Sequence, residues 1–160
     1  MNDRTLVFLA DEQNVLLAMK KKGFGAGKWN GYGGKVEPGE TIVGAAVREL
    51  REESEISIEQ KELLALGVMH FVFLEKHEWD QDVHIFLLES MKEAKETEEM
   101  KPEIFSKQKI PFSDMWEGDD KWIPLILEKQ KIEATLEFTG EGNFSRIIFE
   151  KPFKKIIEKK

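Results

Sequence analysis

Short apolar runs separated by polar turns make up most of this chain, and they predict β-strands. Thr5 to Ala10 and Val15 to Lys20 flank a polar turn, a pattern typical of an antiparallel hairpin. The same pattern predicts strands over four later ranges, 63–74, 82–88, 131–138 and 143–149. The last two ranges flank a glycine-containing turn, which indicates a closing hairpin.

Two segments carry helical patterns instead. Residues 42–54 contain no proline and follow Thr41, a residue type that caps helix N-termini. Residues 122–130 predict a shorter helix, capped by Asp119 or Asp120. Strands, one long helix, further strands and a late helix together predict a mixed α/β fold.

Three polar segments predict loops or ends. Residues 20–28 hold three glycines among four lysines, which indicates either a mobile surface loop or a loop that cradles phosphate. The acidic stretch 92–103 predicts a loop, and the basic last ten residues predict a frayed tail. Because no linker is long enough to separate domains, we expect a single domain over residues 1–160.

A cluster of carboxylates marks the predicted helix. At 100° per residue, Glu49, Glu52 and Glu53 fall on one face, which also carries apolar residues. Carboxylates among apolar neighbours need a compensating cation, and Mg²⁺ prefers such oxygen ligands. The alternative is a solvated helix held by i,i+4 ion pairs, Arg48 with Glu52 and Arg51 with Glu55.

Composition excludes several classes of protein. The chain has 160 residues, 41% of them hydrophobic, and the absence of cysteine excludes disulfides, thiolate metal sites and cysteine nucleophiles. A net charge of −7 argues against binding to a nucleic-acid polymer. With no apolar run of membrane-spanning length and no signal peptide pattern, we expect a soluble cytoplasmic protein that does not bind membranes, and a monomer.

A long spaced motif covers the acidic helix and the loop before it. Gly34 is followed after five residues by Glu40, and after seven more by the run Arg48-Glu49-Leu50-Arg51-Glu52-Glu53. This spacing resembles the motif of the Nudix hydrolase superfamily. Outside it, residues 15–149 resemble the branch that hydrolyses oxidised purine nucleoside triphosphates such as 8-oxo-dGTP. That resemblance is carried by residues 19–41 and by the short segments DVHIF, EEMKP, IPFSDMW and WIPL.

The resemblance implies a Nudix α/β/α sandwich and a set of site residues. Magnesium, with manganese as a substitute, is implied to bind at Glu49, Glu52, Glu53, Glu99 and the Gly33 carbonyl, and the glutamates at 49, 52 and 53 are implied to be catalytic. The reaction implied is attack of water at phosphorus, which releases a nucleoside monophosphate and pyrophosphate and so keeps damaged nucleotides out of DNA. The partner is therefore a small nucleotide, and its implied binding residues are Thr5, Lys20, Phe24, Asn30, Phe71, Met100, Trp116, Asp119 and Asp120.

The chemistry of two of these residue types agrees with a base pocket. Trp116 offers a flat apolar face, and base stacking is worth about 1–3 kcal/mol. Adjacent Asp119 and Asp120 cannot easily both ionise in a dry pocket, so one is expected to stay protonated and donate to the purine. Taken alone, Trp116 also fits a core anchor and the aspartates fit helix caps, so both alternatives stay open.

The chain departs from the family pattern at four places. Glu55 replaces the glycine that ends the catalytic helix, so that helix either ends with strain or runs longer. Gln81 stands where the animal enzymes have methionine, the hairpin at His77 to Trp79 is longer, and Glu117-Gly118 carries an extra residue. These changes leave the base preference open. The alternative functions are a Nudix pyrophosphohydrolase acting on another nucleoside diphosphate derivative and a catalytically silent ligand-binding module.

Overall fold

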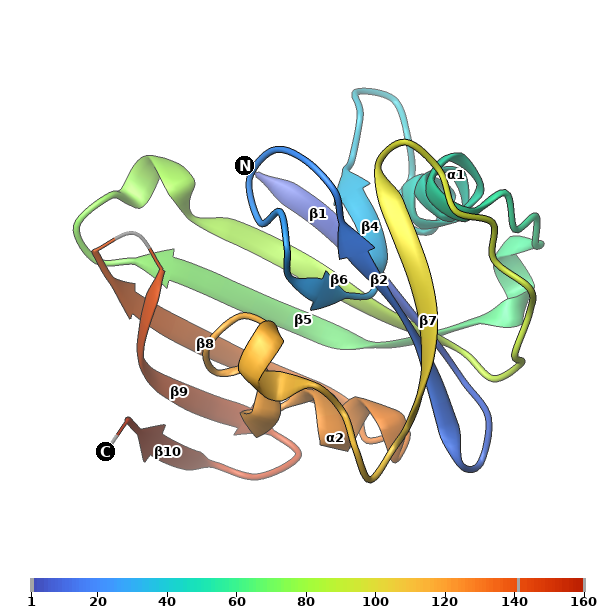
Figure 1. The fold of residues 1–160 in the computed structure, drawn as a ribbon. Helices are drawn as coiled ribbons and strands as arrows, with labels where there is room; N and C mark the ends of the chain where they lie inside the picture. Colours follow the sequence, from blue (N-terminus) through green and yellow to red (C-terminus); the bar gives the residue numbers. More distant parts are fainter. Residues whose placement is uncertain (1, 141, 160) are drawn as a thin grey trace.

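A single mixed sheet of ten strands dominates the computed structural model, which describes residues 2–140 and 142–159 (Figure 1). Its strands are β1 (Asp3–Ala10), β2 (Asn14–Lys20), β3 (Trp29–Asn30), β4 (Tyr32–Lys35), β5 (Leu63–Phe73), β6 (Gln81–Leu88), β7 (Met100–Ser106), β8 (Ile132–Thr139), β9 (Asn143–Lys151) and β10 (Lys155–Glu158). The α-helices in this part of the chain are α1 (Ile42–Ser54) and α2 (Ile123–Leu127). Four 3₁₀ turns complete the pattern, η1 (Gln60–Glu62), η2 (His77–Trp79), η3 (Phe112–Asp114) and η4 (Asp119–Lys121).

Strand β1 connects the parts of the sheet that surround the site. The strand order is β10-β9-β8-β5-β6-β1-β2-β3, with β4 paired to β1 and β7 paired to β2. β1 runs antiparallel to β2, as the predicted hairpin requires, and parallel to β6, as β5 does to β8. Because β4 leads into α1, its pairing with β1 brings the acidic helix against the centre of the sheet.

The sheet is covered on both faces. Leu6 and Phe8 of β1 pack in the larger core together with Ile123 of α2, whereas Val7 packs in the second core together with Leu50 of α1. This alternation follows from the two-residue period of a strand. The predicted α/β/α sandwich is therefore confirmed, with α1 and α2 on opposite faces.

Helix α1 begins and ends as its sequence predicts. Thr41 is the N-cap, and its hydroxyl accepts a hydrogen bond from the Gly44 amide at 3.0 Å. The helix ends at Ser54, because Glu55 adopts a left-handed conformation with φ of 62°. Of the two alternatives for Glu55, the structure shows the strained ending.

Three sequence expectations were wrong in this structure. The final residues of the expected loop 92–103 belong to β7, which pairs along the whole length of β2. The C-terminal tail is not frayed throughout, since β10 pairs with β9 over four residues. Helix α2 is shorter than residues 122–130, and no aspartate side chain caps it, because the chain at 119–121 forms η4. For β7 and β10, partners distant in sequence decide the local structure.

No helix in the described part of the chain is both long and apolar enough to cross a membrane.

Candidate active site

The three carboxylates of α1 lie at different depths. Glu53 is 5% exposed, the side chain of Glu49 is 16% exposed, and that of Glu52 is 55% exposed. The predicted inward orientation therefore holds for Glu53 and Glu49, while Glu52 lies at the rim. Buried carboxylates are rare unless something compensates their charge.

Glu53 is the most deeply buried of the three. Its Oε1 accepts a hydrogen bond from the Gly33 amide of β4 at 2.9 Å. Burial is the main reason why its pKa rises to about 8, and the charges of Glu49 and Glu99 add to this effect. The Gly33 amide and the charge of Lys20 lower the pKa but do not offset the burial. Glu53 is therefore a desolvated carboxyl group with two acidic neighbours and one lysine nearby.

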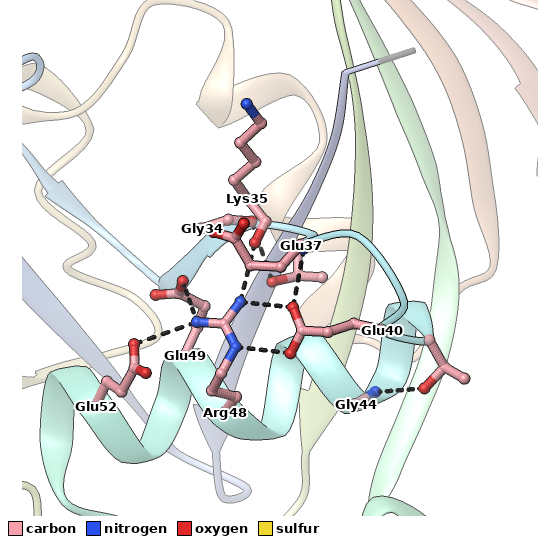
Figure 2. A network of polar contacts seen from close by, with 10 residues as sticks. Gly34, Lys35, Glu37, Glu40, Gly44, Arg48, Glu49 and Glu52 are labelled. Atoms are coloured by element: carbon pink, nitrogen blue, oxygen red, sulfur yellow. Dashed lines mark hydrogen bonds and ion pairs between the residues drawn. The ribbon is translucent and has the colours of Figure 1, made fainter.

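Arg48 holds the outer carboxylates together. Its guanidinium donates to both oxygens of Glu40, at 2.7 and 2.8 Å, and also to Glu49 Oε1 at 2.8 Å and Glu52 Oε2 at 3.2 Å. Figure 2 shows Arg48 between Glu40 on one side and Glu49 and Glu52 on the other. The i,i+4 pair between Arg48 and Glu52 is a feature of the alternative in which the helix is solvated and held by ion pairs. Helix α1 therefore combines such a pair with the buried carboxylates of the other alternative.

Two glycines of β4 let the chain pass close to these groups. A Cβ on Gly33 would lie 1.8 Å from the Thr5 carbonyl oxygen, a clash with backbone that side-chain movement cannot relieve. A Cβ on Gly34 would lie 2.5 Å from the Glu49 carboxyl carbon. The glycines of the motif thus permit the close approach of β4 to β1 and to α1.

The donor set of this region fits a hard divalent cation. Desolvation raises the pKa of Glu49 as well as that of Glu53, and the charge of Glu99 raises both. Oxygen-rich, electron-donating groups of this kind suit magnesium or manganese. Within residues 2–140 and 142–159, no three acidic or histidine side chains are already gathered at metal-binding spacing. Glu49 and Glu52 each accept from Arg48 through one oxygen, Oε1 and Oε2 respectively, so the second oxygen of each is not engaged by Arg48.

A cavity of about 330 Å³ opens beside Glu53 and extends over the α2 face of the sheet. It falls within the range of volumes that small-molecule sites occupy. Nearly all of the expected substrate-binding residues line it, namely Thr5, Lys20, Phe24, Asn30, Phe71, Met100, Trp116 and Asp119, together with Gly33 and Glu53. The other expected site residues, Glu49, Glu52, Glu99 and Asp120, do not line the cavity.

The two adjacent aspartates have separate environments. Asp119 is 3% exposed, and burial raises its pKa to about 8, with a smaller contribution from the charge of Asp120. The Trp122 indole favours the charged form of Asp119, although the two side chains do not reach hydrogen-bonding geometry. Asp120 instead faces a shallower surface hollow and pairs with Lys121 at 3.1 Å. The expected protonated aspartate is thus Asp119, and desolvation is the main cause.

Asn30 reaches the same cavity with its amide held in one orientation. Its Oδ1 accepts a hydrogen bond from the Gly31 amide at 2.8 Å. The side-chain nitrogen is then the group with donors left for a ligand. Asn30 and Asp119 therefore present hydrogen-bond donors to the cavity from two separate segments.

An aromatic chain borders the cavity mouth. Phe24 lies against Trp116, with ring centroids 5.1 Å apart, and against Trp79 of η2, at 6.1 Å. Trp79 in turn contacts Phe73 at 5.7 Å, and the Lys76 ammonium lies 4.0 Å from the Trp79 ring. The lengthened hairpin thus supplies a tryptophan that supports Phe24 at the mouth.

Sequence reasoning missed several residues that line the cavity. They include Arg4, Lys28, Phe73, Trp122 and Phe138. Gln81, noted in the sequence only as a departure from the family pattern, also lines the cavity. The period of a strand could have indicated Phe73, which lies two residues after Phe71 on the same face of β5. For Trp122 and Phe138 the sequence holds no comparable signal, because their place depends on how α2 and β8 pack.

Comparison with known proteins identifies the family of this chain. The NUDIX domain model matches residues 2–126. The chain belongs to the Nudix family. It is 47% identical over 137 residues to the oxidized purine nucleoside triphosphate hydrolase of Danio rerio, a match that covers 85% of this chain and 86% of that protein. It is also 47% identical over 138 residues to the protein of the same name from Mus musculus, with 86% of each covered.

The fold of this Nudix chain also matches solved structures. The crystal structure of a MutT protein from Bacillus halodurans superposes with a TM-score of 0.77, at 23% identity, over 94% of this chain and 98% of that one. A NUDIX hydrolase from Nitrosomonas europaea superposes with a TM-score of 0.63, at 18% identity, over 87% of this chain and 79% of that one. At these identities the two structures establish the fold alone.

Proposed function

We propose that this Nudix hydrolase cleaves oxidised purine nucleoside triphosphates to the nucleoside monophosphate and pyrophosphate. The observation that carries the proposal is one cavity that touches both Glu53 of the catalytic helix and the donors Asn30 and Asp119. A nucleotide whose triphosphate lies toward Glu53 would place its base toward those donors. The names of the relatives from Danio rerio and Mus musculus support the same substrate class.

The residues at the phosphate end of the cavity have different roles. Lys20, which lines the cavity and lowers the pKa of Glu53 through its charge, is placed to hold the phosphates. Water attacks phosphorus at the bridge between the α and β phosphates and the P–O bond of that bridge breaks. The nucleoside monophosphate and pyrophosphate separate, and the water's proton passes to solvent. Glu53, fixed by the Gly33 amide, stays oriented toward this end. Arg48 keeps Glu49 and Glu52 beside it.

Magnesium is the cofactor that we propose, with manganese as a substitute. Glu49, Glu52 and Glu53 would hold it, with Glu99 and the Gly33 carbonyl as further ligands. When bound, such an ion lowers the pKa of the attacking water and neutralises phosphate charge.

The base end of the cavity supports a purine as the ligand. Protonated Asp119 and the Asn30 amide nitrogen can donate to carbonyl oxygens or ring nitrogens of the base. The flat faces of Phe24 and Trp116 suit a planar ligand. We further propose that the chain acts as a monomer on free nucleotides in the cytoplasm, as one domain.

The test is kcat/KM with Mg²⁺ for 8-oxo-dGTP, 2-hydroxy-dATP, dGTP, a nucleotide sugar and a dinucleoside polyphosphate. We expect a preference for an oxidised purine, with pyrophosphate as product. Activity confined to the sugar or the dinucleotide would refute the proposed substrate class. Binding of a nucleotide without any hydrolysis would indicate a ligand-binding module instead.

A further inference from the structure

Arg4 lines the cavity from strand β1. The site residues expected from the sequence include no positively charged side chain on this strand. It belongs to β1, next to Thr5, and its Cα partner on β6 is Val83. Val83 also lines the cavity, as does Gln81 two residues earlier on the same face of β6. Arg4 and Gln81 therefore form a polar edge in a wall that is otherwise aromatic and aliphatic.

The guanidinium of Arg4 carries a donor without an acceptor. Its Nε is buried and has no hydrogen-bond partner in the described part of the chain. A buried donor without a partner destabilises the folded protein, and such groups are rare in native structures. Because Nε itself is closed off from solvent, a ligand in the cavity would meet the terminal nitrogens of the same guanidinium.

The position of Arg4 favours the base over the phosphates. Gln81 is the Cα partner of Phe71, which belongs to the aromatic wall, and Val83 continues the same face toward Arg4. The phosphate end is defined instead by Lys20, Gly33 and Glu53. The guanidinium fork of arginine matches a planar acceptor edge such as that of a purine with carbonyl oxygens.

We propose that Arg4 is a specificity-determining residue that donates to an acceptor on the edge of the nucleobase, with Gln81 beside it. The proposal rests on the function proposed above, because it assigns a role within that cavity. It adds a third donor to Asn30 and Asp119. In the free protein Nε stays unpaired, and the substrate would pair with the terminal nitrogens of the guanidinium.

This role predicts opposite effects on stability and on binding, which a merely structural arginine would not produce. We expect Arg4→Met, which keeps the length of the side chain, to raise the Tm of the ligand-free protein. The same substitution should weaken the binding of 8-oxo-dGMP by about 10-fold or more, as for loss of a hydrogen bond to a charged group. Arg4→Lys, which keeps the charge but not the fork, should recover only part of the affinity.

The experiment combines thermal unfolding of the free protein with calorimetric titration of 8-oxo-dGMP and, separately, of inorganic pyrophosphate. Lys61→Met is the matched control, because the side chain of Lys61 is 82% exposed and absent from the cavity lining. We expect pyrophosphate binding to be the same in the parent, Arg4→Met and Lys61→Met. An equal loss for pyrophosphate would overturn the proposal in favour of a phosphate contact.

A fall in Tm with unchanged 8-oxo-dGMP affinity would show that Arg4 is structural and would also overturn the proposal. Failure of the proposed function has a different signature. In that case the parent itself binds no 8-oxo-dGMP, and the titration is repeated with whichever nucleotide of the hydrolysis panel the parent accepts. Loss of affinity for that nucleobase in Arg4→Met would still support the role of Arg4, and unchanged affinity would refute it.

Discussion

Arg48 donates two hydrogen bonds to the carboxylate of Glu40, from Nε at 2.7 Å and from Nη2 at 2.8 Å. The same guanidinium donates to the carbonyl oxygen of Lys35 at 3.1 Å and to Glu49 on the catalytic helix. One side chain thus ties the loop before α1 to the acidic face of the helix. Paired bonds of this kind fix geometry more strongly than a single contact does.

We expect Arg48→Gln to lower kcat, because Glu49 and Glu52 lose the cation that holds them beside Glu53. A displacement of about 1 Å at a catalytic group can cost about 100-fold in rate. Steady-state kinetics with the best substrate of the panel would measure the loss. Arg51→Gln is the matched control, since Arg51 is exposed on the same helix. A rate for Arg48→Gln equal to that of this control would contradict the prediction.

The same pair predicts a change in acid stability. Hydrogen bonding to Arg48 lowers the pKa of Glu40 to about 2, from 4.5. Because the folded-state pKa is the lower one, this contribution to stability is complete above about pH 4.5 and is lost as the pH falls through about 2. The stability of Arg48→Gln should therefore approach that of the parent at pH 2 and lie below it at pH 5. Denaturant unfolding at both values would check the convergence.

We expect Glu53→Gln to abolish most of the activity while the fold persists. Losing one central charged group at such a site costs on the order of 10²- to 10³-fold in kcat. The glutamine oxygen can still accept from the Gly33 amide, so circular dichroism should be unchanged. Glu55→Gln, two residues along the chain with a side chain 58% exposed, should keep the rate of the parent. An active Glu53→Gln enzyme would remove Glu53 from the catalytic set.

Glu55→Gly should stabilise the protein. A left-handed residue other than glycine costs about 1–2 kcal/mol, and Glu55 has φ of 62°. The exposed ion pair with Lys95, at 3.6 Å, contributes little. For a chain of this size we expect the Tm to rise by about 2–4 °C or more. Glu55→Ala keeps the strain without the charge, so it should not show this rise, and equal Tm values for both variants would disprove the strain account.

We expect kcat/KM to depend on pH because Asp119, at the base end of the cavity, changes its protonation. Burial raises its pKa to about 8, so it stays protonated at pH 7 and loses its proton as the pH rises through about 8. We expect kcat/KM for an oxidised purine to fall across that range in the parent. Asp119→Asn should lack this fall, because its amide donates at every pH. A parallel fall in both proteins would assign the titration to another group.

Asp119 should also make the stability of the folded protein depend on pH, with the opposite sign from Glu40. Between about pH 4 and pH 8 the folded state holds a proton on Asp119 that the unfolded state has released. The stability of the parent therefore decreases as the pH rises through this window, by up to about 1.4 kcal/mol per pH unit from this group. Relative to the parent, Asp119→Asn should become more stable as the pH rises from 5 to 8, which chemical denaturation would measure.

The sequence by itself determined helix α1, most of the strands and ten of the residues that line the cavity. Periodicity located β1, β2, β5, β6, β8 and β9, because alternation of apolar residues is a local property of a strand. Thr41 and the absence of proline marked α1. The spacing of Gly34, Glu40 and Arg48 indicated the Nudix family, since those residues meet within one loop and one helix.

Only the tertiary structure decided the features that depend on distant partners. β7 begins in the acidic stretch 92–103 and β10 lies in the basic last ten residues, and both become strands because β2 and β9 supply their hydrogen bonds. Asp119 and Asp120 are neighbours in sequence, yet packing buries the first and leaves the second paired with Lys121. Arg4 joins the cavity through the parallel pairing of β1 with β6. Burial and pairing between segments far apart in the chain set these outcomes, and a local pattern does not encode them.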